Sequence, residues 1–245
     1  MLRKLNSGLL AASALCSLVA FWNRNDLPQT VAFHPGLEHE PKQRALTKAP
    51  LTVPYAGVDY RVEPLYDYEL YGLVVSYRMH DGEDSMHRWS NDRLNMADVC
   101  VVWSDTAFSE HLGKLDFWNG VFTCNVQTRD SVAWSHFNMN QLSNNHLISE
   151  DPFIRERVEE VRIGDQIRVK GWLARYGAVG GGELRGTSTT REDAGNGACE
   201  TIYVREFEVV EPGFSLWRAA MYLSLATLIV TLLIHFALPH KPYHD

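Results

Sequence analysis

The feature that most constrains this chain is an apolar run near its C-terminus. Residues 219–238 read AAMYLSLATLIVTLLIHFAL and contain no formally charged side chain. A helix of about 20 such residues crosses the ~30 Å hydrocarbon core of a bilayer. Trp217 and Arg218 precede the run and Lys241 follows it, which places amphipathic and cationic side chains at both interfaces. Residues 217–238 are therefore predicted to be a transmembrane helix, followed by a cytoplasmic tail over residues 239–245.

A second apolar stretch lies at the N-terminus, where residues 8–22 follow Arg3 and Lys4. It is short for a span, and residues 1–22 are typical of a signal anchor or a signal peptide. Cleavage prefers small residues at positions −3 and −1, and Leu18 before Ala20 fits that rule poorly, which favours an uncleaved anchor. In both interpretations the basic end stays in the cytoplasm, so the folded domain is expected on the other side of the membrane.

Between the two apolar segments, composition indicates a linker and one folded domain. Residues 23–58 show little periodicity and are predicted to form an extended linker, because they contain Pro28, Pro35, Pro41, Pro50 and Pro54. Residues 59–212 are predicted to form the domain, which ends where Pro212 and Gly213 break the last strand. The formal net charge of −7 argues against a nucleic-acid partner, because binding a phosphate backbone relies on clustered Lys and Arg.

Within the domain, apolar and polar residues alternate in short segments that are typical of β-strands. These segments lie near residues 69–77, 97–105, 120–129, 165–177 and 201–210. One helix is expected after Ser149, with Ile154, Val158 and Val161 on its core face. The alternation of the last strand shifts between Val204 and Phe207, which predicts a β-bulge. The predicted fold is mostly β: a small antiparallel OB-like barrel with one inserted helix, flanked by N- and C-terminal transmembrane helices.

Three segments of the domain also carry a resemblance. They are SNNHLIS (residues 143–149), GDQIRVKGWL (residues 164–173) and RGTSTTREDAGNGACETIYV (residues 185–204). Together they resemble a group of uncharacterised bacterial membrane-anchored proteins, over roughly the second half of the domain. The resemblance implies a bacterial envelope protein and brings no activity with it. With the topology above, it places the chain in the bacterial inner membrane with the main domain in the periplasm.

Three cysteines fall in the domain predicted to lie outside the cytoplasm, where disulfides persist: Cys100, Cys124 and Cys199. Cys100 and Cys124 lie in two short strands that are candidates for neighbours, so their pairing is favoured. Pairing of Cys199 with either of them is the competing possibility. A metal site is not predicted, because the chain contains neither a Cys-x-x-Cys motif nor a close Cys/His pair.

The most polar loop is the candidate for a ligand site. The loop contains Arg185, Arg191, Asp193 and Glu200 among glycines that let the backbone turn tightly. Asn145 and His146 join them if the Ser143–Ser149 segment reaches the same end of the barrel. A structural ion-pair network is the other interpretation of these charges. No Ser-His-Asp or Cys-His pattern with supporting context is present, so a function other than catalysis is favoured over an enzyme. No cofactor is predicted.

These observations predict a membrane-anchored periplasmic binding or scaffold module, acting as an accessory subunit of an envelope complex. Its expected partners are the lipid bilayer and a membrane or periplasmic protein. The alternative function is a small-ligand-binding or hydrolytic site at the loop that contains Arg191, Asp193 and Glu200.

Overall fold

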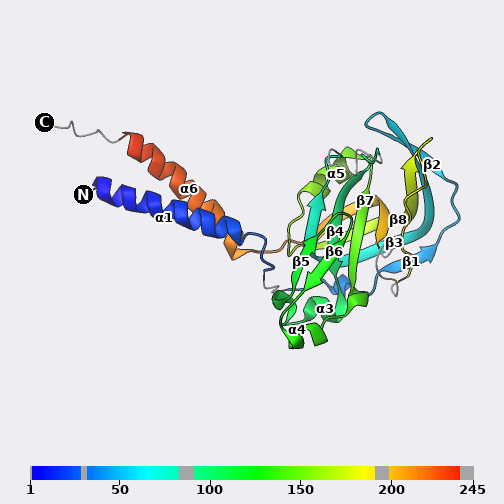
Figure 1. The fold of residues 1–245 in the computed structure, drawn as a ribbon, viewed down its shortest axis with the longest axis horizontal. Coiled ribbons are helices and arrows are strands. Elements are labelled where there is room, and N and C mark those ends of the chain that lie inside the picture. Colours follow the sequence, from blue (N-terminus) through cyan, green and yellow to red (C-terminus); the bar gives the residue numbers. More distant parts are fainter. Residues whose placement is uncertain (1, 29–31, 83–90, 191–198, 238–245) are drawn as a thin grey trace. The chain divides into compact units, whose positions relative to one another are not determined.

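The computed structural model describes residues 2–28, 32–82, 91–190 and 199–237, and the chain divides into two compact units (Figure 1). The first unit contains the two terminal helices, α1 (Leu2–Trp22) and α6 (Leu216–Ala237). The second unit ends at Gly213 and contains the strands and the remaining described helices.

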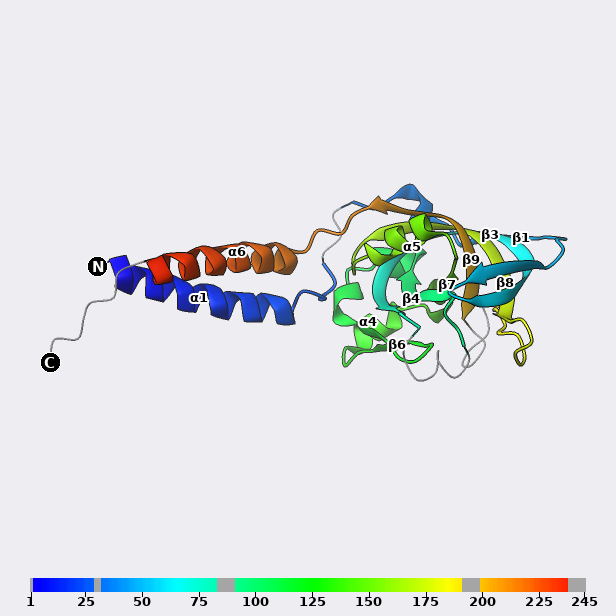
Figure 2. The same cartoon turned by 90° about the horizontal axis from the view of Figure 1, so that it is seen from above.

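Both terminal helices are long and apolar enough to cross a membrane. They run antiparallel and side by side (Figure 2). The side-chain amide of Asn6 donates to the carbonyl of Thr231 at 3.1 Å, and the hydroxyl of Ser17 donates to Ser224 Oγ at 2.9 Å. All four residues are buried, which matches the preference for small and polar side chains where helices pack in lipid.

The second unit is dominated by one sheet, to which the described residues contribute seven strands. They are β1 (Lys42–Ala45), β2 (Leu51–Tyr55), β3 (Val58–Met79), β4 (Asn95–Val102), β7 (Leu142–Ile148), β8 (Gln166–Ala178) and β9 (Glu200–Glu211). Their order is β1-β3-β4-β7-β9-β8, with β2 also on β3 and β8 also on β3. Only the pair of β7 and β9 is parallel among these strands. A sheet-dominated domain with two terminal apolar helices confirms the coarser part of the fold prediction.

The core of this unit forms where inward side chains of the strands meet one helix. Buried Leu70, Val99, Leu147 and Ile202 belong to one apolar cluster. The helix is α5 (Pro152–Glu159), which lies between β7 and β8 in the chain. As predicted, Val158 of α5 belongs to this cluster and Ile154 packs against it, while Val161 joins the cluster from just beyond the end of the helix. Asp151, rather than Ser149, caps α5, because its carboxylate accepts the Phe153 N–H at 2.8 Å.

Part of the predicted linker is folded into the domain. The short helix η1 (Pro35–Glu38), β1 and β2 lie between residues 35 and 55, and both strands pair with β3. Leu37 and Val53 are almost fully buried. The prolines are compatible with this arrangement, because Pro35 begins η1, where its missing N–H is harmless, and Pro54 lies in β2, an outer strand that pairs only with β3 among the described strands.

The predicted irregularity of the last strand is present. Glu206 of β9 pairs with Lys170 of β8, and Val204 pairs with the next residue, Gly171. Arg205 is therefore the extra residue of a β-bulge. The bulge lies between Val204 and Phe207, as the shift in alternation indicates.

A small substructure connects β4 to β7 and covers one face of both strands. It consists of α3 (Ser104–Phe108), η2 (Leu112–Lys114), β5 (Asp116–Asn119), β6 (Cys124–Gln127), α4 (Ser131–Ser135) and η3 (Met139–Gln141). β5 and β6 form a separate two-stranded hairpin. A disulfide between Cys100 and Cys124, the favoured pairing, joins this hairpin to β4 with 5.8 Å between the two Cα atoms.

Candidate functional site

The polar side chains of β4 and β7 divide between the two faces of the sheet. Asp98 stands opposite His146 in the strand ladder, and Val99 stands opposite Asn145. Because successive side chains of a strand point to opposite faces, His146 shares a face with Asp98, and Asn145 faces the apolar core. Two separate polar clusters result.

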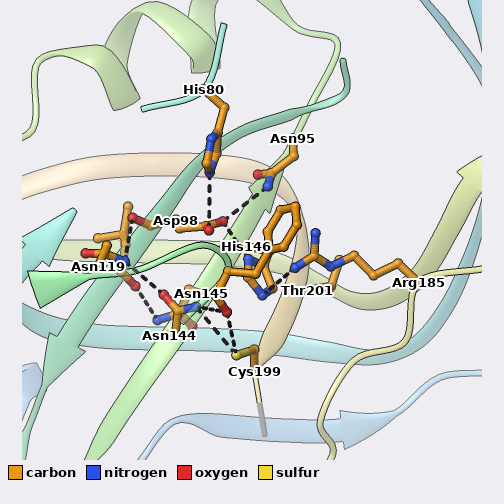
Figure 3. Close-up of polar contacts among 12 residues, drawn as sticks. His80, Asn95, Asp98, Asn119, Asn144, Asn145, His146, Arg185, Cys199 and Thr201 are labelled. Atoms are coloured by element: carbon orange, nitrogen blue, oxygen red, sulfur yellow. Dashed lines mark hydrogen bonds and ion pairs between the residues drawn. The ribbon is translucent and has the colours of Figure 1, made fainter. Parts of the chain in front are cut away.

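The first cluster surrounds the fully buried carboxylate of Asp98 (Figure 3). His146 Nδ1 lies 2.5 Å from Asp98 Oδ1, and His80 Nε2 lies 3.2 Å from Oδ2. The side-chain amide of Asn95 donates to Oδ1 at 3.1 Å. One buried acid thus holds three polar side chains from β4, β7 and the segment after β3.

The protonation states of this cluster follow from its surroundings. Burial raises the pKa of Asp98, but hydrogen bonds from His146 and His80 outweigh burial and hold that pKa below its usual range. Burial lowers the pKa of His146, which keeps its ring neutral. A neutral ring that donates from Nδ1 to Asp98 accepts at Nε2, and Arg185 Nη2 lies 2.8 Å from Nε2.

Arg185 connects this cluster to the wall of a cavity, because it contacts His146 and lines the cavity. Its backbone pairs with Tyr176 of β8 through two hydrogen bonds, and its guanidinium lies 4.1 Å from the centre of the Phe122 ring. The cavity has a volume of about 850 Å³. Its described lining comes from the start of β3, the segment before β4, the β5–β6 loop, the end of β8 and the hairpin that follows β8: Tyr60, Asn91, Asp92, Phe122, Tyr176, Gly177, Ala178, Val179, Gly180, Gly181, Gly182, Glu183 and Arg185.

A second charged group of this wall is Asp92. Its Oδ2 accepts the Tyr176 hydroxyl at 2.5 Å, and its Oδ1 accepts the backbone N–H of Asn95 at 3.2 Å. Burial raises the pKa of Tyr176 well above its usual value, so this hydroxyl keeps its proton and donates it to Asp92. Asp92 Oδ2 lies 3.9 Å from Arg185 Nη1.

Phe122 covers the first cluster from the loop between β5 and β6. Its ring meets His146 edge-on, with 5.9 Å between the ring centres, and its backbone has a left-handed φ of +57°, which is uncommon for a residue other than glycine. The Phe122 carbonyl accepts a hydrogen bond from the Asn144 side chain at 3.1 Å. Together with the Cys100–Cys124 disulfide, this contact holds the loop over the buried histidines.

The second cluster lies on the core face. Ser143 Oγ donates to Glu200 Oε2 at 2.5 Å, and the side-chain amide of Asn145 donates to the carbonyl of Val99 at 3.1 Å. Ser143, Asn145 and Glu200 are almost fully buried. Nearby, burial raises the pKa of the Cys199 thiol, which disfavours the reactive thiolate form.

The predicted ligand residues are therefore separated in the described part of the chain. Asn145 and Glu200 belong to the core-face cluster, and His146 belongs to the Asp98 cluster. Arg191 and Asp193 lie outside the described residues. Among the residues that are described, no group of three His, Cys, Asp or Glu side chains is arranged to hold a metal ion.

Sequence reasoning placed Arg185 in the polar loop that is the candidate ligand site, but it did not identify Asp98, Asn95, Asp92 or His80 as members of a site. The available signal was Asp98 itself, a charged residue between the apolar residues of ADVCVV. Comparison of the chain with protein-family models, with curated proteins and with solved structures found no match, so its function rests on this geometry.

Proposed function

We propose that this chain is a membrane-anchored binding or scaffold module and an accessory subunit of an envelope complex in the bacterial inner membrane. The observation that carries the proposal is the antiparallel packing of α1 and α6. These two helices of membrane-spanning length precede and follow one sheet domain in the sequence. Antiparallel spans return both termini to the same side. Arg3 and Lys4 favour the cytoplasm for that side, and the Cys100–Cys124 disulfide fits an oxidising periplasm for the domain.

The OB-like interpretation of the domain belongs to the same proposal. Its support is the sequence of pairings from β3 through β4, β7, β9 and β8, together with the further pairing of β8 with β3. The position of α5 between β7 and β8 agrees with the predicted inserted helix. The parallel pair of β7 and β9 departs from the antiparallel pairing that the sequence predicted. Such barrels bind many unrelated partners, so the fold alone does not select one.

The short connection between β9 and α6 favours a partner at the membrane. Four residues, 212–215, separate Glu211 from Leu216, and a chain of that length reaches on the order of 15 Å when fully extended. The N–H of Gly213 donates to Asp165 Oδ1 at 2.8 Å, which anchors the connection on the domain side. A domain tethered in this way meets membrane proteins at a high effective concentration.

The test of this proposal has two parts. Protease added to the outside of spheroplasts should digest the domain and leave a cytoplasmic marker protein intact. The full chain, cross-linked in native membranes and purified in mild detergent, should then carry a second protein in fixed ratio. A domain protected from the external protease contradicts the periplasmic location, and a chain that purifies alone after cross-linking contradicts the role as an accessory subunit.

The alternative function at Arg191, Asp193 and Glu200 stays a prediction. The bond from Ser143 to the Glu200 carboxylate fits a structural role for this acid, so a ligand site there depends on Arg191 and Asp193. Arg191→Gln and Asp193→Asn, made separately, should each abolish the growth phenotype that the wild-type chain supports, while the melting temperature of each variant stays close to that of the wild type. Equal loss of folding contradicts the alternative.

A further inference from the structure

Two opposite charges on the cavity wall, Arg185 and Asp92, are held by the same buried acid, and the exposed Glu183 is the third charged residue of the described lining. Arg185 is connected to Asp98 through the ring of His146. Asp92 is connected to Asp98 through Asn95, whose backbone N–H donates to Asp92 and whose side chain donates to Asp98. Arg185 and Asp92 are thus positioned by one network, and the Phe122 ring packs against both Arg185 and His146 of that network.

Burying this network is costly for the fold. Removing a carboxylate from water costs several kcal/mol even in a relaxed protein, and apolar side chains of the same volume often stabilise a core equally well. Departures from these packing rules concentrate at functional sites. A network whose members fix the positions of Arg185 and Asp92 points to a use for that pair.

Arg185 and Asp92 are close without being hydrogen-bonded to each other. The 3.9 Å between Arg185 Nη1 and Asp92 Oδ2 exceeds hydrogen-bond length. Among the described residues, the Arg185 side chain makes a single hydrogen bond, to His146, although a guanidinium carries five N–H donors. The pair therefore presents a donor group and an acceptor group next to each other at the edge of the cavity.

The rest of the cavity suits a small organic molecule. Its volume of about 850 Å³ lies within the range of ligand pockets in proteins. Beside the charged pair, the described wall offers Phe122, Ala178, Val179 and backbone of the glycine-rich hairpin, together with the exposed carboxylate of Glu183 in that hairpin. A ligand that fits this wall has an anionic group for Arg185, a neighbouring cationic group for Asp92, and an apolar body.

We propose that this cavity binds a small zwitterion, with its carboxylate or phosphate on Arg185 and its ammonium group on Asp92. A free amino acid and the head group of a zwitterionic phospholipid both offer this chemistry. The inference goes beyond the proposed function, and it does not require a protein partner.

The first experiment compares probes that differ only in charge. The full chain is placed in nanodiscs of phosphatidylglycerol, which lacks an ammonium group, and is titrated calorimetrically with L-phenylalanine, 3-phenylpropionate and 2-phenylethylamine. L-phenylalanine should bind about tenfold to hundredfold more tightly than either singly charged analogue, because each analogue leaves one hydrogen-bonded charge unpaired. O-phosphoethanolamine is titrated as well, because it represents a lipid head group. If it binds more tightly than L-phenylalanine, the site is assigned to lipid. If it binds more weakly, the site is assigned to a free amino acid.

Variants of the pair test the assignment of each charge. In Asp92→Asn, L-phenylalanine and 3-phenylpropionate should bind equally well. In Arg185→Gln, L-phenylalanine and 2-phenylethylamine should bind equally well. These ratios are measured within one variant, so a change in stability common to both probes does not affect them.

A cavity-filling variant tests the location without touching the charged network. Gly182 lines the cavity and has open space at its Cβ position. Gly113 in η2 also has open space at its Cβ position but is not among the lining residues, so it serves as the control. Gly182→Phe should abolish binding of the best probe, and Gly113→Phe should leave it unchanged. The proposal is overturned if neither zwitterion binds, if 3-phenylpropionate or 2-phenylethylamine binds as tightly as L-phenylalanine, or if Gly182→Phe binds the best zwitterion like wild type.

Discussion

Replacing Asp98 by asparagine is the most direct test of the buried network. The substitution keeps the shape of the side chain and removes the charge that His146, His80 and Asn95 surround. Arg185 then loses the acid to which His146 connects it. Breaking a buried pair by removing one partner typically costs about 3–5 kcal/mol. In a domain of this size, each kcal/mol of lost unfolding free energy lowers the melting temperature by about 2–4 °C. Asp98→Asn should therefore lower the melting temperature by roughly 6–20 °C.

The matched control is Asp67→Asn, which also removes an acid from an ion pair. Asp67 lies 2.9 Å from Arg44 at the surface, with 83% of the Arg44 side chain exposed. Exposed pairs contribute at most about 1 kcal/mol, so this variant should melt within about 4 °C of wild type. Thermal unfolding of the full chain in nanodiscs, followed by near-ultraviolet circular dichroism, measures both. Equal shifts for the two variants would refute the view that Asp98 organises the buried site.

Three further predictions concern other parts of the chain. The double variant Cys100→Ser/Cys124→Ser should lower the free energy of unfolding of the domain by about 2–5 kcal/mol in urea titration. Dithiothreitol should lower the free energy of unfolding of the wild type to that of the double variant, and it should leave the double variant unaffected. Burial lowers the pKa of His146, so below pH 6.5 the unfolded chain binds a proton that the folded chain does not. As the pH drops below 6.5, the free energy of unfolding should therefore decrease by up to about 1.4 kcal/mol per pH unit. Urea titrations at each pH measure this slope, and His146→Gln should reduce it. Asn6→Ala and Ser17→Ala should each weaken the helix pair by about 0.6 kcal/mol in steric-trapping measurements, and an unchanged pair contradicts the contacts described.

The parts of the fold that the sequence predicts are those with a local signal. The length of the apolar runs predicts α1 and α6, the spacing of Val158 and Val161 predicts α5, and the shifted alternation near Arg205 predicts the bulge of β9. The prolines between residues 35 and 55 favour a linker, but β1 and β2 lie there and pair with β3. Composition does not reveal these strands, because it does not show that β3 is long enough to pair with β1 and β2 as well as with β4 and β8. Pairing between distant segments is a tertiary property, and it outweighed the local preference.

The buried site illustrates the same division between local and distant information. Every residue of β4 is buried, because the core covers one face and the β5–β6 hairpin covers the other. A strand covered on both faces is expected to be apolar throughout, and a charged residue within it must be compensated by partners. Asp98 is therefore recognisable from sequence as a residue that needs partners. Their identity depends on the register that places His146 opposite Asp98 and on the hairpin after β8 that returns Arg185 to the same place. An isolated acid in an otherwise apolar strand thus predicts that a buried polar network exists, and only the fold shows where that network leads.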